Sequence, residues 1–174
     1  MTVPTSLLRE TICLGDFGIS IPAGTSVINK VHQPVRYCAP ELFHDKDPSF
    51  ASDMWSYMCL FAELYLDVRL FYPTGSPAVV SRMVDVLGPL SEHWKGDYKG
   101  AGTSDDWWYD QSRKPIRTLK STIYRLRPEA SQTERDHVLS IMSKGFCYLP
   151  KSRLSTAELQ QDLSFQAIMK LFSY

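Results

Sequence analysis

Apolar residues recur with the period of an α-helix over most of this chain. The clearest case is residues 53–66, DMWSYMCLFAELYL, which contain no helix-breaking residue. One helical face carries Trp55, Met58, Ala62 and Tyr65, and further apolar residues occupy the other faces. Because a helix that is apolar nearly all round is buried, we predict a central buried helix here.

The start of this helix has its own signals. Ser52 is a suitable N-cap, since a serine hydroxyl accepts a hydrogen bond from a free N–H group of the first turn. Asp53 follows in that turn, where the helix dipole favours a carboxylate. We therefore predict that the helix begins immediately after Ser52.

The same period predicts five further helices. Gly88 and Pro89 end the first of them, and Ser155 with Glu158 matches a capping box at the start of another. The predicted ranges are 77–87, 119–126, 134–144, 155–163 and 165–172. One short strand is expected within residues 7–14, where Ile12 and Leu14 alternate with other residues. The predicted fold is mainly α, with a short β element at the N-terminus.

Two stretches interrupt the helical pattern. Prolines and a glycine break residues 19–40, and irregular loops of this length are usually functional or disordered. Residues 89–115 are rich in Gly, Asp and aromatic residues and are expected to form a surface insert. Within it, SDDWWYDQ at 104–111 admits two interpretations. Its aromatic residues could grip a partner, or Trp107 and Trp108 could pack onto the chain's own core, which is the interpretation we favour.

Several polar side chains are interpreted as ordinary surface residues. The scattered histidines form no metal-binding pattern and are expected at the surface: His32, His44, His93 and His137. A group of basic residues is interpreted as a solvated face that nearby aspartates offset: Arg113, Lys114, Arg117 and Lys120, with Asp105, Asp106 and Asp110.

Composition narrows the function classes. The 174 residues are 44% hydrophobic and 22% charged, as is typical of one globular domain. Nineteen basic residues balance 19 acidic residues, so no overall field attracts nucleic acid or an anionic membrane. The longest apolar stretch, residues 54–66, is too short to span a bilayer. We therefore expect no nucleic acid partner and no membrane partner.

Cysteine usage and the N-terminus indicate the compartment. The four cysteines form no CxxC pair, which argues against a metal cluster and favours buried, reduced thiols: Cys13, Cys38, Cys59 and Cys147. The first ten residues, MTVPTSLLRE, lack the basic region and apolar run of a signal peptide. We expect an intracellular protein of the cytoplasm or nucleus.

Candidate chemistry begins at Asp16-Phe17-Gly18. Taken alone, this motif could be the polar tip of a turn, because Asp and Gly are common turn residues. Further motifs follow in a fixed order: APE at 39–41, DMWS at 53–56, LGP at 87–89, and PKSR at 150–153 leading into STA at 155–157.

This series resembles the C-terminal lobe of a eukaryotic protein kinase, from the strand before the metal-binding loop to the last helix. FAELYLDVRLF at 61–71 and MVDVLGPLSEHW at 83–94 are similar to segments of the cyclin-dependent, MAP and SR-protein kinase branch. The chain is also similar to kinase-like proteins of filamentous fungi. The resemblance implies a partial kinase-like domain over residues 1–174, with an activation segment at 16–41 and an insert at 89–131.

The resemblance implies a role for each matching residue. Asp16 would hold the Mg²⁺ that bridges the phosphates of ATP, with Gly18 beside it, because a hard cation needs oxygen ligands. Phe17 would pack beneath Asp16 and set its active or inactive position. Glu41 and Arg153 would form a buried ion pair that ties the activation segment to the helical core.

Other positions acquire roles in the same way. Asp53 would anchor the catalytic loop, and Trp55 belongs to the same structural motif. Within the activation segment, the resemblance implies candidate phosphorylation sites and two residues of the substrate-binding floor: Ser20, Thr25 and Ser26, with Pro34 and Tyr37.

The chain also departs from the kinase pattern. A complete kinase has a Gly-rich loop, a Lys paired with a Glu, and a catalytic loop, and the 15 residues before Asp16 contain none of them. Pro34, Cys38 and Met58 stand where this branch usually has Thr, Arg and Gly. Mg²⁺ and ATP are therefore implied for a complete parent and not expected for this chain alone.

These observations leave more than one function open. The first is a Ser/Thr protein-kinase-like protein whose parent transfers phosphate from Mg-ATP to protein hydroxyl groups, with this chain inactive unless a complementing chain supplies the missing half. The alternative is a non-catalytic, pseudokinase-type module that binds a protein partner. A gene fragment without independent function is a third. In the first two cases the partner or substrate is a protein. The isolated chain should also expose an apolar surface on its central helix, where the missing kinase parts would pack.

Overall fold

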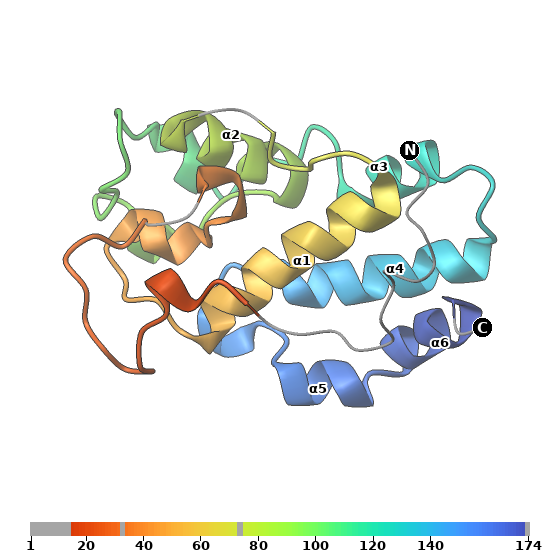
Figure 1. Ribbon diagram of the computed structural model, residues 1–174. Helices are drawn as coiled ribbons and strands as arrows, with labels where there is room; N and C mark the ends of the chain where they lie inside the picture. Colours follow the sequence, from red (N-terminus) through yellow and green to blue (C-terminus); the bar gives the residue numbers. More distant parts are fainter. Residues whose placement is uncertain (1–14, 32–33, 73–74, 173–174) are drawn as a thin grey trace, which may run out of the picture.

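The structure, a computed structural model, describes residues 15–31, 34–72 and 75–172 (Figure 1). Within these ranges the chain forms six α-helices and no strand: α1 Phe50–Leu66, α2 Ser76–Leu87, α3 Leu119–Leu126, α4 Gln132–Gly145, α5 Thr156–Gln161 and α6 Leu163–Phe172. The mainly α prediction is confirmed. The strand expected within residues 7–14 lies outside the described residues.

Short 3₁₀ helices complete the connections between these elements. They are η2 Phe17–Ile19, η3 Val35–Tyr37, η4 Pro40–His44, η5 Glu92–Trp94, η6 Asp106–Tyr109 and η7 Pro150–Ser152. Helix α4 packs against α1, α3 and α6, and α5 leads into α6 (Figure 1). On the other side of the bundle, α2 contacts η3 and η6. The segment before α1 and the insert therefore both pack against α2.

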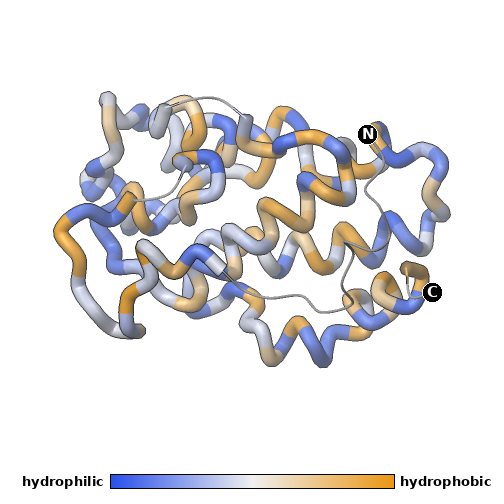
Figure 2. Tube along the Cα trace, in the orientation of Figure 1, coloured by the Kyte–Doolittle hydropathy of each residue, from blue (hydrophilic) through white to orange (hydrophobic). Residues whose placement is uncertain are grey.

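Helix α1 supplies much of the core, and hydrophobic residues recur along its length (Figure 2). The predicted inner face is buried at every position, since Trp55, Met58 and Ala62 are fully covered and Tyr65 is 8% exposed. The outer face is different. Its exposed apolar residues form what we call the α1 stripe: Phe50, Tyr57, Leu60 and Leu64. The prediction of a helix buried nearly all round is therefore wrong on this face.

The start of α1 also differs from the prediction. The N-cap is Ser49, whose backbone is extended, and not Ser52. Ser52 is instead the third helical residue of a capping box, and its Oγ accepts a hydrogen bond from the Ser49 N–H at 3.1 Å. The second capping box, Ser155 with Glu158, is present at the start of α5 as predicted.

Helices α1 and α4 approach each other closely at Met58 and Gly145. The Met58 side chain is fully buried. A Cβ atom built on Gly145 would lie only 2.4 Å from the Met58 Cε atom, well inside van der Waals contact. This chain therefore places the large side chain on α1 and the small residue on α4 at this contact.

The insert contributes to the core more than expected. Residues 89–115 were predicted to lie at the surface, yet Leu90 and Trp108 are fully buried and Trp94 is 7% exposed. The Trp108 Nε1–H donates to Ser81 Oγ at 2.9 Å, which confirms the packing interpretation for this residue. Trp107 is half-buried beneath the Arg113 guanidinium, whose Cζ lies 3.9 Å from the ring centre.

Smaller expectations can also be compared with the structure. Arg113 forms an ion pair with Asp85 of α2 at 3.5 Å. Hydrogen bonds from Ser112 and, to a smaller extent, the Arg113 charge lower the pKa of Asp110, so this aspartate of the insert also offsets Arg113. The described cysteines are free thiols, of which Cys38 and Cys59 are buried. Among the described residues, no helix combines the length and the hydropathy needed to cross a bilayer.

Candidate functional site

A buried ion pair joins two parts of the fold that are far apart in the sequence. Arg153 Nη1 donates to Glu41 Oε1 at 2.7 Å, and Arg153 Nη2 donates to Glu41 Oε2 at 2.8 Å. The side chains are 0% and 1% exposed, although 112 residues separate them in the sequence. The structure therefore contains the bidentate contact that the kinase resemblance implied.

Every N–H group of this guanidinium has an acceptor. Besides the two bonds to Glu41, Nη1 donates to Ala51 O at 2.6 Å, Nη2 to Tyr148 O at 3.0 Å and Nε to Cys147 O at 2.9 Å. A guanidinium has five N–H donors, and all five are used here. The arginine thus satisfies three backbone carbonyls and one carboxylate at the same time.

The ion pair rests on the core through α1. Ser52 Oγ donates to Glu41 Oε1 at 3.2 Å, a contact that no sequence motif indicated. The Arg153 Cζ atom lies 5.1 Å from the centre of the Trp55 ring, which in turn stacks on Phe71 at 5.7 Å. Glu41, Arg153 and Trp55 therefore form one connected cluster with Ser52.

The predicted substrate floor is anchored to α1 as well. Pro34 precedes η3, and Tyr37 at its end donates its hydroxyl to Glu63 Oε2 at 2.8 Å. Ser56 Oγ donates to the Tyr37 carbonyl at 2.8 Å. The hydrogen bond to the Glu63 carboxylate raises the pKa of Tyr37 and lowers the pKa of Glu63. The backbone here is held at fixed points along α1.

Asp47 organises the loop that carries the predicted phosphorylation sites. Its Oδ1 accepts hydrogen bonds from Ser26 Oγ and Val27 N, both at 3.1 Å, and from Lys30 Nζ. The Lys30 ammonium is the main cause that lowers the pKa of Asp47. No motif in the sequence indicated this residue. The other two candidate sites, Ser20 and Thr25, are exposed like Ser26.

Asp16 lies at a strained turn on the surface. Its φ of 62° and ψ of 55° are in the left-handed region, which Asp tolerates better than most residues, and it precedes η2. Phe17 is 66% exposed in this chain, so it does not pack beneath Asp16 here as the resemblance implied. Gly18 follows within η2 and is exposed.

The described residues do not by themselves fit a magnesium ion. No group of three or more His, Cys, Asp or Glu side chains within ranges 15–31, 34–72 and 75–172 could hold a metal. Asp16 is one carboxylate, whereas Mg²⁺ is usually held by carboxylates together with phosphates and waters. A metal role for Asp16 therefore requires ligands beyond these residues.

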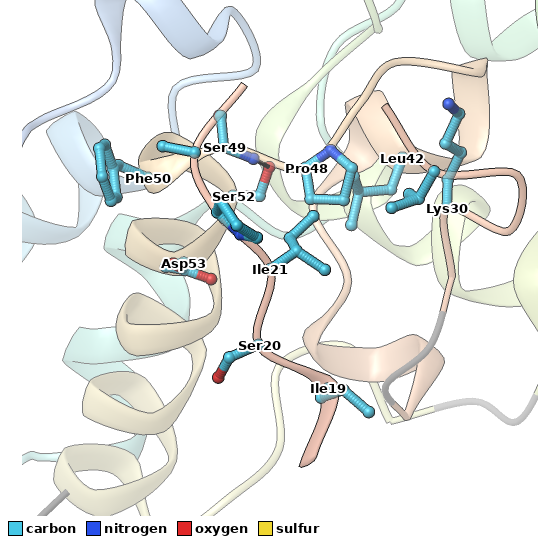
Figure 3. Close-up of a pocket in the computed structure, with 13 residues that line it drawn as sticks. Ile19, Ser20, Ile21, Lys30, Leu42, Pro48, Ser49, Phe50, Ser52 and Asp53 are labelled. Atoms are coloured by element: carbon cyan, nitrogen blue, oxygen red, sulfur yellow. Dashed lines mark hydrogen bonds between the residues drawn. The ribbon is translucent and has the colours of Figure 1, made fainter. Parts of the chain in front are cut away.

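A hollow of about 270 Å³ separates the first part of the activation segment from the start of α1 (Figure 3). Its walls are residues 19–23, Val27, Lys30 and Leu42 on one side and residues 48–50, Ser52 and Asp53 on the other. Partial burial raises the pKa of the Asp53 carboxyl. Asp53 lines this hollow, and its predicted anchoring role stays a prediction.

His44 is buried, and the expectation of a surface histidine is wrong for it. The side chain is 0% exposed, with Nδ1 2.7 Å from Pro40 O and Nε2 2.8 Å from the Tyr109 hydroxyl. The Trp94 ring stacks on it at 5.0 Å. Trp94 and Tyr109 of the insert cover it, and no local pattern in the sequence indicated this contact. His93 is exposed and His137 is half-buried, while His32 lies outside the described residues.

Burial lowers the pKa of His44 below its usual value, because the neutral ring is favoured in this environment. In the unfolded chain the pKa would be about 6.5. The unfolded state therefore binds more protons as the pH falls below about 6.5, so stability is full above that pH and decreases below it until the folded-state pKa is reached.

Most of the chain is similar to known protein kinases. The family model described as protein kinase domain matches residues 6–165. The chain is similar to cyclin-dependent kinase 7 of Dictyostelium discoideum, with 27% identity over 165 residues, covering 89% of this chain and 41% of that protein. It is 35% identical over 94 residues to the serine/threonine-protein kinase nekl-2 of Caenorhabditis elegans, covering 52% of this chain and 26% of that protein.

A solved structure gives a similar picture of the fold. The MAP kinase LmaMPK10 from Leishmania major superposes with a TM-score of 0.54 at 22% identity, covering 76% of this chain and 41% of that chain. This chain therefore spans less than half the length of each of these three proteins.

Proposed function

This chain belongs to the protein kinase domain family, and we propose that it serves as the helical C-terminal lobe of a Ser/Thr protein kinase related to the cyclin-dependent and MAP kinases. The observation that carries the proposal is the buried cluster of Glu41, Arg153 and Trp55. This cluster fixes Glu41, the last residue of the proposed activation segment, to the helices, and such an anchor is what an activation segment requires to receive a protein substrate.

In a complete kinase, Mg²⁺ and ATP supply the phosphoryl group, and a protein hydroxyl receives it. The role of this chain in such a kinase is to position the substrate segment along η3. It also places Asp16 at the start of the activation segment. Catalysis of this kind depends on several groups that act together on one triphosphate. Of these groups the 174 residues contain only Asp16. We expect no phosphate transfer from this chain alone.

The α1 stripe supports a role for a complementing chain. Phe50, Tyr57, Leu60 and Leu64 are 74%, 41%, 50% and 86% exposed along one side of α1. Apolar rows of this kind commonly mark an interaction surface. The missing kinase parts, or a partner that replaces them, would cover it. The non-catalytic, pseudokinase-type module remains the second candidate, and the replacements at Pro34 and Cys38 favour it.

A chimera separates the two candidates. Residues 15–174 are joined behind the N-terminal lobe and catalytic loop of the Dictyostelium relative and incubated with Mg²⁺, radiolabelled ATP and a generic protein substrate. If the chain is a kinase lobe, the chimera transfers label and Asp16→Ala abolishes the transfer. If the folded chimera transfers none, the interaction module is the better interpretation. Label transfer by the 174 residues alone, lost in Asp16→Ala, would overturn the expected inactivity of the isolated chain.

A further inference from the structure

A second hollow lies at the other end of α1 and carries an unusual concentration of arginine. It has a volume of about 590 Å³ and is bounded by the C-terminal end of α1, the loop after it, α2 and α3. Four arginines line it: Arg69, Arg82, Arg117 and Arg125. Two carboxylates, Glu63 and Asp67, share the lining, so the local charge is 4 − 2 = +2 in a chain whose net charge is zero.

The arginines are not equivalent. Arg69 is already paired, since its Nε donates to Glu63 Oε1 at 3.1 Å. Arg117 and Arg125 are exposed, and neither forms an ion pair with a carboxylate of the described ranges. Arg82 donates through Nε to Leu70 O at 3.2 Å. Within the described part of the chain, the Nη nitrogens of Arg82 have no acceptor.

The backbone holds these cations in place. Arg82 lies on α2, with its Cζ 5.5 Å from the centre of the Tyr72 ring. The N–H groups of Ile116 and Arg117 both donate to Asp85 O on α2, at 2.8 and 3.1 Å, and so fix the chain just before α3. Arg125 is in the last turn of α3, where the helix dipole favours a cation. The site is thus assembled from separate segments before any ligand arrives.

We propose that this arginine pocket binds a phosphorylated side chain of a protein partner. Guanidinium groups match the oxygens of a phosphate monoester and form charge-assisted hydrogen bonds to it. Val68, Leu70 and Leu126 also line the hollow and can contact the carbon stem of such a side chain. The acidic residues Glu63 and Asp67 disfavour a long polyanion, so a nucleic acid fits less well than one phosphorylated residue.

The arginine pocket lies apart from the first hollow, which Asp53 lines and which we call the Asp53 hollow. Helix α1 has 17 residues and is therefore about 25 Å long, with the two hollows at its opposite ends. The arginine pocket can accordingly hold a partner without occupying the activation segment. The proposal depends on the pocket alone and stands whether or not the complete protein transfers phosphate.

The test uses the 174-residue chain and fluorescein-labelled degenerate peptide mixtures with a fixed phosphoserine or phosphotyrosine, together with the unphosphorylated mixtures. Fluorescence anisotropy should show that at least one phosphorylated mixture binds roughly tenfold or more tightly than its counterpart. The double variant Arg117→Gln/Arg125→Gln should remove that preference. The matched control Lys151→Gln/Lys170→Gln loses the same charge from exposed positions elsewhere and should keep it.

Amide chemical-shift changes provide the location independently of the variants. Addition of the bound mixture should shift the signals of Thr122 and Leu126, which line the pocket. Equal loss of binding in both double variants would overturn the proposal, because it would indicate only general electrostatic attraction. So would tighter binding of a DNA duplex or of inorganic phosphate, or shifts confined to the Asp53 hollow.

Discussion

Replacement of Arg153 by Met tests how strongly the buried ion pair holds the fold together. The change removes all five hydrogen bonds of the guanidinium and leaves the buried Glu41 carboxylate with Ser52 as its one remaining side-chain donor among the described residues. Breaking one partner of a buried pair costs about 3–5 kcal/mol. The carbonyls of Ala51, Cys147 and Tyr148 each lose one donor as well, so we expect Arg153→Met at the upper end of that range.

Glu41→Leu is the complementary change. It leaves the buried guanidinium bound to the three carbonyls of Ala51, Cys147 and Tyr148, so its cost should be smaller than that of Arg153→Met. The double variant should cost less than the sum of the two single changes, with a coupling energy of about 1–3 kcal/mol, because it leaves no unpaired charge.

Equilibrium unfolding in urea, followed by tryptophan fluorescence, measures all three free energies. The matched control is the cycle for Lys46 and Asp97, which pair at 3.0 Å with side chains 49% and 45% exposed. Such a surface pair should show a coupling of about 0–1 kcal/mol. The reasoning is refuted if the buried pair couples no more strongly than the exposed one.

Other predictions concern the rest of the fold. His44→Phe should flatten the loss of stability below about pH 6.5 that the lowered pKa of His44 produces, as measured by unfolding at pH 5 to 8. Gly145→Ala should lower the unfolding free energy by about 1–3 kcal/mol through overpacking against Met58, and less so in a Met58→Ala background. Leu60→Ser with Leu64→Ser should reduce hydrophobic-dye binding and leave Tm nearly unchanged, because both side chains are exposed.

For each of these three predictions, one result would contradict the reasoning. The exposed His93, changed to Phe, is the control for the pH experiment, and an equal flattening there would contradict the role of His44. An unchanged stability of Gly145→Ala would mean that the Met58 side chain relaxes freely. A large fall in Tm on changing Leu60 and Leu64 would show that another part of the protein covers the α1 stripe.

Short-range physics made the helices predictable from the sequence. Apolar spacing at 3.6 residues per turn, together with caps such as Ser155 with Glu158, located the α-helices to within a few residues. These signals act between neighbours along the chain, so no knowledge of the fold is needed to use them. Ser49 and Ser52 were harder to distinguish, because both belong to one capping box.

The contact of Glu41 with Arg153 was predicted in a different way. No local signal joins residues 112 positions apart, and only the order of motifs suggested that they meet. The sequence indicated this pair but not its further hydrogen-bond partners. Ser52, Ala51 and Cys147 also bind the pair, because α1 and the loop before α5 meet at the same point.

The burial of His44 and the assembly of the arginine pocket were decided by the tertiary structure alone. His44 is covered because Trp94 and Tyr109 fold back over it, and a lone histidine carries no signal of that. Arg117 is exposed, as expected of a solvated face, but only the fold shows that it lines a pocket with Arg82, 35 positions away, because α2 holds the chain before α3. Helical periodicity is a property of neighbouring residues, whereas a pocket depends on which surfaces the whole fold brings together.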